Sequence, residues 1–586
     1  MKGKVIFPGS RFKVRFLPFD VTVVVAPGTS LLDAVTQAGL PIKAGCGGAG
    51  MCGDCLLRIK SGSCRVRQSA AISENLRSQG YVLACLAEVT ENLTVHLPQF
   101  QELSIQTITD STFFREHRDE VSGCCGPITL PEIVADVIPS ATDKNIFGIA
   151  CDVGTTTVVV RLVDLRTGKV LSTASGYNHQ LKCGEDVISR IHYAQNPERL
   201  LELNNLIIAT INRLIQRCLE SIHGIFLDIY FASVSGNTAM TYLLLNMNPR
   251  DIQKDPYASV LNRARFRTSR EMGLKMNPEA VVLCAPVVGS FVGGDITAGL
   301  LCTPLLRDAE KVSLFIDVGT NGELVMGNKD WMVTCACSAG PAFEGGGTKC
   351  GMPAAGGAIE RIQLNKGHIE YRVLGNGKPR GVCGSGLVDL LSALFVQGYV
   401  DRRGKLNKEK AGSRIAETER GEGFLIEEAN RCYWEKDLVI TENDIANLIR
   451  TKGAVFSACS LLLKNVGLTF KDLAAVYVAG GFGQYLNIEN AVRIGLFPDL
   501  PRDRFHYLGN SSLLGAFLIL LSDKNRDLVN ETAAKMTYIE LNTEPGYMNE
   551  YTGSLFLPHT DMSLFPSVKR VFENSEILKR QYPRPS

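Results

Sequence analysis

Four cysteines near the start of the chain have the spacing of iron–sulfur ligands. Cys46, Cys52 and Cys55 lie in one glycine-rich loop, and 29 residues separate Cys55 from Cys85. A [2Fe–2S] cluster needs two thiolates per iron, and glycines let the backbone curl round it and direct N–H groups at its sulfides. The alternatives are a four-cysteine zinc site and ordinary core cysteines, but zinc ribbons have two C-x2-C pairs and this segment has one. We therefore predict a [2Fe–2S] cluster, with Cys64 as a bystander thiol.

The residues around these cysteines predict a small β-grasp domain. Apolar side chains alternate along residues 12–17, and residues 21–25 follow after a short break, which predicts a β-hairpin. Ser30 is the predicted N-cap of a helix that Gly39 ends. Further strands are expected near residues 56–60 and 92–97. Residues 1–98 resemble the plant- and vertebrate-type [2Fe–2S] ferredoxin domains.

A second set of candidate residues occurs twice in the chain. The motif Asp-Val-Gly-Thr ends a buried strand at residues 152–155 and again at residues 317–320. In such a turn, glycine lets the backbone approach an anion, and consecutive N–H groups with a Thr hydroxyl can surround a phosphate. An Asp at the strand end can hold hydrated Mg²⁺ or orient a water. Two copies in matching strand–turn–strand contexts predict two similar lobes. The predicted residues are Asp152, Gly154, Thr155 and Thr156 in the first copy, and Asp317, Gly319, Thr320, Asn321 and Glu323 in the second.

Further candidates lie in three other glycine-containing segments. A buried strand at 475–480 opens into Gly480, Gly481 and Gly483, which suits a loop lying flat against a nucleoside; an ordinary strand-to-helix turn is the alternative. Asp295 follows two glycines and is predicted to position Mg²⁺ or water, or else to form a turn. Residues 338–347 contain Gly340 and Glu344; the family resemblance described next implies that these two belong to the nucleotide site, and a helix-start carboxylate is the alternative for Glu344.

With these motifs, residues 146–545 resemble the ASKHA superfamily of acetate and sugar kinases, heat-shock chaperone ATPases and actin. The resemblance implies an actin-like, ribonuclease H-like α/β fold with ATP between two lobes, behind an α+β ferredoxin domain. The expected boundaries are 1–98 (ferredoxin), 99–145 (linker), 146–308 (first lobe), 309–545 (second lobe) and 546–586 (C-terminal extension). In the linker we expect one short helix, near residues 130–137, and we interpret Cys124–Cys125 as a chance pair.

The whole chain resembles the reductive activators of corrinoid proteins. The resemblance rests on short stretches that occur in order: residues 178–191, 236–240, 292–296, 339–345 and 381–389. It implies ATP-dependent return of Co(II) to Co(I) in a methyltransferase system, with a corrinoid protein as partner, a low-potential electron donor, bound Mg²⁺ and a homodimer. Ser385, in Cys-Gly-Ser-Gly, is a candidate to offer oxygen to cobalt or to line the corrinoid contact; the alternative is a helix N-cap.

Other functions remain as alternatives at this point. One is an ATP-driven electron donor to another metalloenzyme, as in the activators of 2-hydroxyacyl-CoA dehydratases, which lack a ferredoxin domain. Another is a redox-sensing ASKHA protein that binds a partner without delivering electrons. A small-metabolite kinase would leave the ferredoxin domain unexplained. Some corrinoid activators carry C-terminal [4Fe–4S] cysteines, but no cysteine follows Cys459 here.

Composition excludes several other classes. The 62 Lys+Arg and 60 Asp+Glu give a net charge of +2, so we expect no nucleic-acid partner. No apolar run approaches the roughly 18 residues of a membrane span, and we expect no membrane association. The first residues lead into no signal-peptide pattern. The 18 cysteines are scattered rather than spaced like a disulfide framework, which favours a reducing, cytoplasmic compartment.

Overall fold

The computed structural model describes most of the chain. The described residues are 11–17, 19–40, 42, 49–51, 53, 55–69, 71–97, 132, 145–184, 186–253, 261–365, 367–418, 421–480 and 486–574. The predicted linker helix and the pair Cys124–Cys125 therefore lie outside the described residues. The contacts divide the chain into two compact units. Unit 1 contains Met1–Leu103, Thr155–Val158 and Gly176–Thr210; unit 2 contains Ser104–Gly154, Val159–Ser175 and Ile211–Ser586.

The N-terminal part of unit 1 is a β-grasp domain, as predicted. Its five-stranded sheet has the order β2-β1-β7-β3-β5. The strands are β1 (Phe12–Leu17), β2 (Val21–Val25), β3 (Leu56–Ser61), β5 (Tyr81–Leu83) and β7 (Leu93–His96). Helix α1 (Leu31–Gln37) begins at Ser30, whose side chain accepts a hydrogen bond from the Asp33 N–H, and Gly39 follows its end with a φ of +65°. The shorter elements are β4 (Cys64–Val66), α2 (Glu74–Ser78) and β6 (Ala87–Val89), of which β4 pairs with β6.

The two larger sheets share a five-strand core of one topology, and each adds one further edge strand, β12 in the first and β25 in the second. The shared core confirms the predicted duplication. The first has the order β10-β9-β8-β11-β13-β12 and the second β24-β23-β14-β15-β16-β25. In each, the strand before the Asp-Val-Gly-Thr turn pairs in parallel with a later strand: β8 with β11, and β14 with β23. The first sheet comprises β8 (Phe147–Val153), β9 (Thr157–Asp164), β10 (Val170–Tyr177), β11 (Ile229–Gly236), β12 (Arg265–Thr268) and β13 (Val281–Cys284). The second comprises β14 (Ser313–Val318), β15 (Gly322–Gly327), β16 (Met332–Cys337), β23 (Ala475–Gly480), β24 (Phe505–Gly509) and β25 (Met536–Tyr538).

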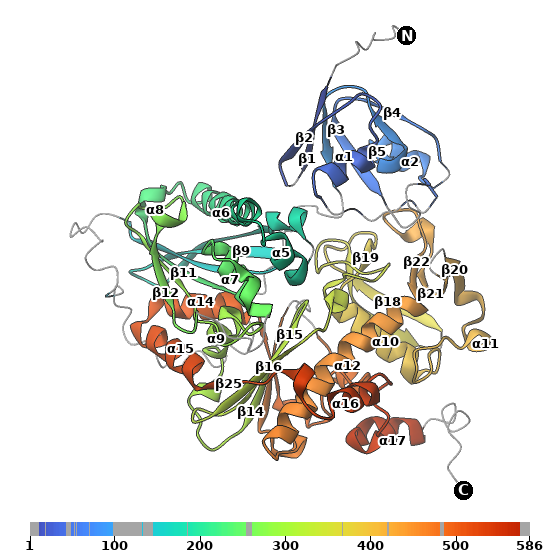
Figure 1. Ribbon diagram of the computed structural model, residues 1–586. Helices are drawn as coiled ribbons and strands as arrows, with labels where there is room; N and C mark the ends of the chain where they lie inside the picture. Colours follow the sequence, from blue (N-terminus) through green and yellow to red (C-terminus); the bar gives the residue numbers. More distant parts are fainter. Residues whose placement is uncertain are drawn as a thin grey trace. The chain divides into compact units, whose positions relative to one another are not determined.

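Helix α14 (Ser511–Leu521) joins the two sheets in one core (Figure 1). It follows β24 in the chain, yet it packs against β8 and β11 of the first sheet and against α9 (Gly294–Leu300). Its side chains share a buried cluster with residues of both sheets, such as Phe231 and Phe315. The predicted boundary at 308/309 therefore separates the two sheets but not their helices. The other helices of the first half are α5 (Val187–Tyr193), α6 (Pro197–Glu220), α7 (Thr238–Leu244) and α8 (Ser269–Met272), and α15 (Asp523–Lys535) follows α14.

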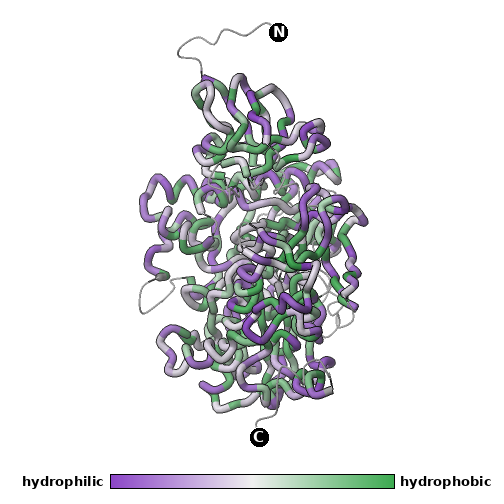
Figure 2. Tube along the Cα trace, turned by 90° about the vertical axis from the view of Figure 1, so that its right-hand side faces the viewer, coloured by the Kyte–Doolittle hydropathy of each residue, from purple (hydrophilic) through white to green (hydrophobic). Residues whose placement is uncertain are grey.

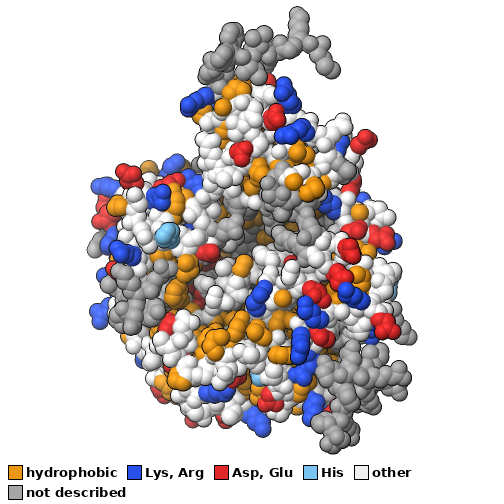
Figure 3. Space-filling view, turned by 45° about the vertical axis from the view of Figure 1, so that its right-hand side comes forward, with side chains coloured by type: hydrophobic (Ala, Val, Ile, Leu, Met, Phe, Trp, Pro, Cys, Tyr) orange, Lys and Arg blue, Asp and Glu red, His pale blue; other side chains and the backbone are white. Residues whose placement is uncertain are grey.

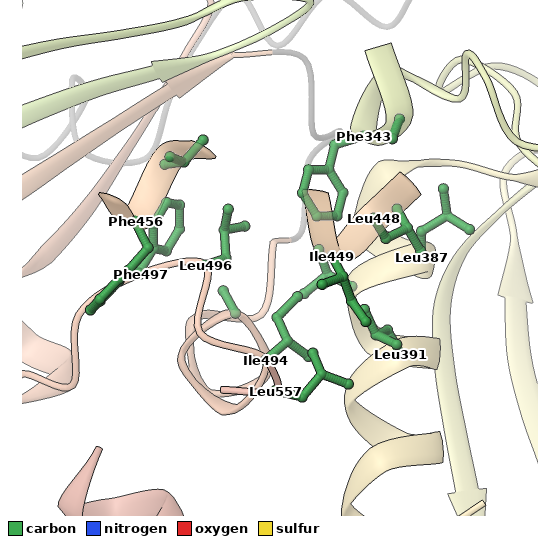
Figure 4. Packing of buried hydrophobic residues seen from close by; sticks show 14 of the residues in the cluster. Phe343, Leu387, Leu391, Leu448, Ile449, Phe456, Ile494, Leu496, Phe497 and Leu557 are labelled. Atoms are coloured by element: carbon green, nitrogen blue, oxygen red, sulfur yellow. The ribbon is translucent and has the colours of Figure 1, made fainter. Parts of the chain in front are cut away.

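A second buried cluster lies around two helices of the C-terminal half, α10 (Gly384–Val396) and α12 (Glu442–Asn465) (Figure 4). Leu557 belongs to this cluster, and so do Phe565 and Val568. Helix α16 (Tyr547–Ser554) packs along α12, and α17 (Pro566–Asn574) follows. Residues 546–574, the described part of the C-terminal extension predicted from 546, thus pack onto the second lobe and place Leu557, Phe565 and Val568 in its core. Two three-stranded sheets complete this region: β17 (Ala358–Asn365), β18 (His368–Val373) and β19 (Gly381–Val382), and β20 (Ile415–Thr418), β21 (Gly421–Glu427) and β22 (Leu438–Thr441).

The charged side chains on the surface reflect the nearly equal numbers of acidic and basic residues in the sequence. Hydrophilic residues mark many of the outer turns (Figure 2), and side chains of both charge signs are interspersed on the face seen in Figure 3. No helix within the described part of the chain combines the length and apolar character that a membrane crossing requires.

Candidate functional site

Two of the four predicted cluster ligands are described, and they lie together. The Sγ atoms of Cys55 and Cys85 are 3.4 Å apart, and both residues are buried free thiols. Burial raises the pKa of the Cys55 thiol to about 11, so a bound cation is needed to hold it as a thiolate at neutral pH. Gly50, with a φ of +75°, lies so close to Leu86 that a Cβ would be 2.7 Å from a leucine methyl. These residues fit an iron–sulfur cluster; Cys46 and Cys52 lie outside the described residues.

Five predicted carboxylates come together at the ends of the two duplicated strands. Asp152 and Asp317 are each the second-last residue of their strands, β8 and β14, and Glu323 faces Asp317 across the β14–β15 pair. Asp295 is in the first turn of α9, and Glu344 is in the 3-10 helix η8 (Pro341–Glu344). They lie up to 192 residues apart in the sequence, and the fold brings them close enough for their charges to interact.

The charges of this group act on one another. Burial, and then the charge of Asp152, raise the pKa of Asp295 to about 7. Burial, and then the charges of Asp295, Asp152 and Glu344, raise the pKa of Asp317 to about 8. The pKa of Glu323 is raised well above its ordinary value by burial and by Asp295 and Asp317. A divalent cation among these oxygens would replace repulsion by attraction, so the residues present fit Mg²⁺.

Asp152 is oriented by the start of α14. Its two carboxylate oxygens accept hydrogen bonds from Asn510 Nδ2 (2.8 Å) and from Ser512 Oγ (2.7 Å). Asn510 is also the N-cap of α14, because its side-chain oxygen accepts the Leu513 N–H. The sequence analysis missed both residues. Their one signal was an Asn-Ser-Ser start before an apolar run, which indicates a helix N-terminus rather than contact with a distant Asp.

The second predicted phosphate turn is fixed by the segment that contains Gly340 and Glu344. The Thr320 hydroxyl donates to the Glu344 carboxylate, and the Gly340 N–H donates to the Thr320 carbonyl (2.9 Å). Within the turn, the Gly319 N–H donates to the Asn321 carbonyl (2.9 Å). A Cβ on Gly319 would lie 3.2 Å from a Glu344 oxygen, so glycine keeps the mouth of the turn open.

The predicted adenosine loop is described only at its first glycine. Gly480 pairs with Val318 at the end of β23 and has a φ of +119°. A Cβ there would lie 2.2 Å from the Val318 carbonyl oxygen, so no other residue fits this position. Gly481 and Gly483 lie outside the described residues, and their role stays a prediction.

In the first predicted phosphate turn, two backbone carbonyl oxygens accept hydrogen bonds. The carbonyl oxygen of Thr155 accepts a hydrogen bond from Arg190 Nη2 (2.6 Å), and that of Thr156 accepts one from the Asn178 N–H (2.9 Å). Gly154 directly precedes this pair and follows β8. The turn is therefore held from its carbonyl side.

Ser385 differs from its expectation as an accessible hydroxyl. It is fully buried in the first turn of α10, and its Oγ donates to the Glu360 carbonyl oxygen (2.9 Å). The N-cap of this helix is Cys383, with no side-chain capping bond, so the alternative prediction for Ser385 is also wrong. The reason is that β17 closes over the start of α10, which the local sequence does not reveal.

The fold and the site define a class of protein. A [2Fe–2S] ferredoxin domain is followed by two sheets with the same five-strand core, each with a phosphate-type turn next to grouped carboxylates, as in ATPases of the ASKHA type. Family models agree along most of the chain. Residues 15–90 match the 2Fe-2S iron-sulfur cluster binding domain, residues 147–308 the RACo middle region and residues 311–569 the C-terminal domain of RACo, the ASKHA domain.

Individual relatives extend this match to nearly the full length. The chain is 33% identical to the corrinoid activation enzyme RamQ of Eubacterium limosum, over 92% of this chain and 98% of RamQ. It is 26% identical to the [Co(II) methylated amine-specific corrinoid protein] reductase of Methanosarcina barkeri, over 74% of this chain and 83% of that protein. The solved structure of a reductive activator for corrinoid, iron-sulfur protein has 39% identity and a TM-score of 0.70, over 95% of this chain and 100% of that one. The chain belongs to the family of reductive activators of corrinoid proteins.

Proposed function

We propose that this protein uses ATP to return the inactive Co(II) state of a corrinoid protein to Co(I), by transferring one electron from its [2Fe–2S] cluster. The observation that carries the proposal is the presence, in one chain, of paired buried cluster thiols and of the carboxylate group beside two phosphate-type turns. A kinase would need the carboxylates and the phosphate-type turns, but it would have no use for the cluster thiols. The relatives named above are activators and reductases of corrinoid proteins.

The energetic problem explains why both features are needed. Plant-type [2Fe–2S] clusters have potentials near about −400 mV, and the Co(II)/Co(I) couple lies lower, so the electron moves uphill. Each 59 mV uphill costs about a factor of ten for one electron. A nucleotide can shift this equilibrium only if the chain binds the Co(II) partner differently in its nucleotide states. We infer that the nucleotide-loaded chain holds the Co(II) protein tightly and that hydrolysis releases it.

The finer assignments follow from the charges in the site. Asp152, Asp295 and Asp317 would hold Mg²⁺ beside the nucleotide phosphates, with Glu323 and Glu344 completing the acidic group. The two Gly-Thr turns would bind the phosphates, and the segment after β23 would lie against the adenosine. When bound, Mg²⁺ supplies charge neutralisation for the phosphates. The chain's part is to orient Asp152 through Asn510 and Ser512 and to fix Thr320 through Glu344.

Other parts of the proposal concern the setting. The chain would act as a homodimer, with a separate low-potential electron donor, in the cytoplasm. Free buried cysteines such as Cys218, Cys284 and Cys459 agree with a reducing compartment.

The test is anaerobic mixing of the protein with a Co(II) corrinoid protein, a chemical reductant and Mg·ATP, with cobalt followed by absorbance. We expect Co(I) to appear only when ATP is present. Cys85→Ser should abolish Co(I) formation by removing a cluster ligand, and Asp317→Asn by disabling the nucleotide site. Asp503→Asn, an exposed carboxylate, is the matched control and should behave as the unmodified protein. ATP-dependent binding of the corrinoid protein without any Co(I) would instead favour the redox-sensing alternative.

A further inference from the structure

The turn that follows β8 is held by one segment of unit 1, residues 177–184 and 186–190, which we call the relay segment. Both of the turn's bonds named above, from Asn178 and from Arg190, start in this segment. Because a peptide unit is planar, fixing the Thr155 and Thr156 carbonyls also fixes the N–H groups on the other side of those peptides. The relay segment therefore sets how the turn presents its N–H groups to a phosphate.

Arg190 makes this connection strong. Its side chain is fully buried and also donates to the Gly184 carbonyl (2.9 Å) and to Gln180 Oε1 (3.3 Å). Burial lowers the pKa of the guanidinium to about 10, so it remains charged at neutral pH. Hydrogen bonds from a charged donor are stronger than neutral ones, and leaving a buried charge with fewer acceptors is costly. A displacement of the turn would therefore be transmitted to the relay segment.

The relay segment is itself stiffened by the first half of α6. Gln180 Nε2 donates to the Leu203 carbonyl (2.9 Å), and Lys182 Nζ pairs with Glu202 Oε1 (2.8 Å). The other oxygen of Glu202 accepts the Tyr193 hydroxyl (2.7 Å). With so many bonds, the segment has few ways to absorb a displacement locally.

The ferredoxin domain rests on the same segment within unit 1. Phe19, in the turn between β1 and β2, is 3% exposed, and its ring centroid lies 6.0 Å from those of Tyr177 and His179. Gly39 approaches so closely that a Cβ would lie 2.4 Å from the Lys182 carbonyl oxygen. Gly39 ends α1 and leads into the loop that carries the cluster cysteines. The relay segment thus contacts the first phosphate turn and also Gly39, which precedes the cluster loop.

We propose that the relay segment couples the first phosphate turn to the ferredoxin domain, so that nucleotide binding and the redox state of the cluster change each other's equilibria. This inference rests on the proposed function, because it requires a bound cluster and nucleotide. Linkage requires the same factor in both directions, and such factors are typically about 5- to 150-fold. A tenfold factor corresponds to about 59 mV in a one-electron potential.

The experiment uses the full chain with its cluster under anaerobic conditions and needs no corrinoid protein. The dissociation constant of a non-hydrolysable ATP analogue with Mg²⁺ is measured with the cluster oxidised and with it reduced. The cluster potential is then measured by EPR-monitored titration with and without the analogue. We expect the two dissociation constants to differ at least fivefold, and the potential to shift by the amount that this ratio requires.

Variants locate the coupling. Phe19→Ala removes the ring contact on the ferredoxin side and should bring the ratio close to one, with unchanged cluster absorbance and unchanged affinity for the oxidised state. Val24→Ala is the matched control, because Val24 lies in the same hairpin and is 43% exposed; it should keep the full ratio. Arg190→Lys keeps the charge but loses the planar fork that reaches three acceptors, and should also reduce the ratio. If Arg190→Lys fails to fold, Phe19→Ala decides.

Two results would overturn the proposal: equal dissociation constants in the two redox states of the unmodified protein, or a full ratio in a folded Phe19→Ala variant. Both are independent of Co(I) formation. If the protein forms Co(I) but its two dissociation constants are equal, the proposed function stands and the coupling through the relay segment is wrong. A chain that shows the ratio but forms no Co(I) with any corrinoid protein keeps the relay and loses the proposed reaction.

Discussion

At the scale of single residues, the decisive feature is repulsion among carboxylates that the fold forces together. Asp295 and Asp317 have pKa values raised to about 7 and about 8, chiefly by burial and next by neighbouring carboxylates. For each of these groups the folded protein binds a proton more tightly than the unfolded chain does. The contribution to stability is therefore complete at low pH and is lost as the pH rises towards the folded-state pKa. Repulsion among these carboxylates therefore lowers the stability of the folded protein at neutral pH, and the same repulsion favours the binding of a cation.

Asp317→Asn tests this effect. Without nucleotide or metal, the unmodified protein should lose stability as the pH rises from about 4 to about 8, and the variant should lose less. At pH 8 we expect the variant to be more stable by at least about 1.4 kcal/mol, the equivalent of one pKa unit. Thermal unfolding at several pH values measures this. Asp503→Asn should follow the unmodified protein, and an Asp317→Asn variant less stable at pH 8 would contradict the charge argument.

Mg²⁺ binding should release protons. The cation stabilises the ionised form of carboxylates that are partly protonated near pH 7, so binding moves protons into solution. Calorimetric titrations with Mg²⁺ in two buffers of different ionisation enthalpy should give different heats, and the affinity should rise between pH 6 and pH 8. Buffer-independent heats together with a pH-independent affinity would show that these carboxylates do not bind the ion.

At the scale of elements, the residues at the start of α14 both cap the helix and hydrogen-bond to Asp152. Asn510 caps the helix and also donates to Asp152, and Ser512 donates to the other oxygen of the same carboxylate. A helix that begins in the second half of the chain thus orients an Asp near the end of β8. This arrangement makes the geometry of the first Asp depend on how the two sheets pack together.

Asn510→Ala should affect stability and nucleotide binding together. The lost cap costs about 0.5–2 kcal/mol of stability. The lost hydrogen bond to a charged group should weaken Mg·ATP binding about tenfold or more, since such bonds contribute about 1.5–3 kcal/mol. Asn407→Ala is the control: Asn407 caps the short helix α11 (Lys408–Ala411), and its removal should lower stability without changing nucleotide affinity. Equal affinities for both variants would mean that Asn510 does not position Asp152.

At the scale of the whole molecule, the end of the described chain completes the second lobe. Leu557 is fully buried in the cluster around α12, and the buried Lys452 Nζ of that helix donates to the Pro558 carbonyl (2.6 Å). The segment therefore contributes packing and polar contacts to the lobe that carries the second phosphate turn.

Leu557→Ala should destabilise the protein by about 2–5 kcal/mol, as expected for a truncated core leucine. Met548→Ala, in the same segment but 64% exposed, should change stability by no more than about 0.5 kcal/mol. Chemical denaturation of both variants makes the comparison. If the Leu557→Ala and Met548→Ala variants were equally stable, the segment that contains Leu557 would not stabilise the second lobe.

Patterns within a few neighbouring residues were sufficient to predict the local elements of this protein. Alternation and capping predicted the β1–β2 hairpin and α1, because those patterns act within a few residues. The repeated Asp-Val-Gly-Thr turn predicted two like lobes, and the cysteine spacing predicted the cluster, because a glycine that admits an anion or a loop that wraps a cluster is a local requirement. Three outcomes needed the folded chain: that α14 returns to β8, that Ser385 is buried and that residues 546–574 pack onto the second lobe. The contacts behind them join residues 360, 25 and 106 positions apart, beyond the reach of any pattern within one helix or strand.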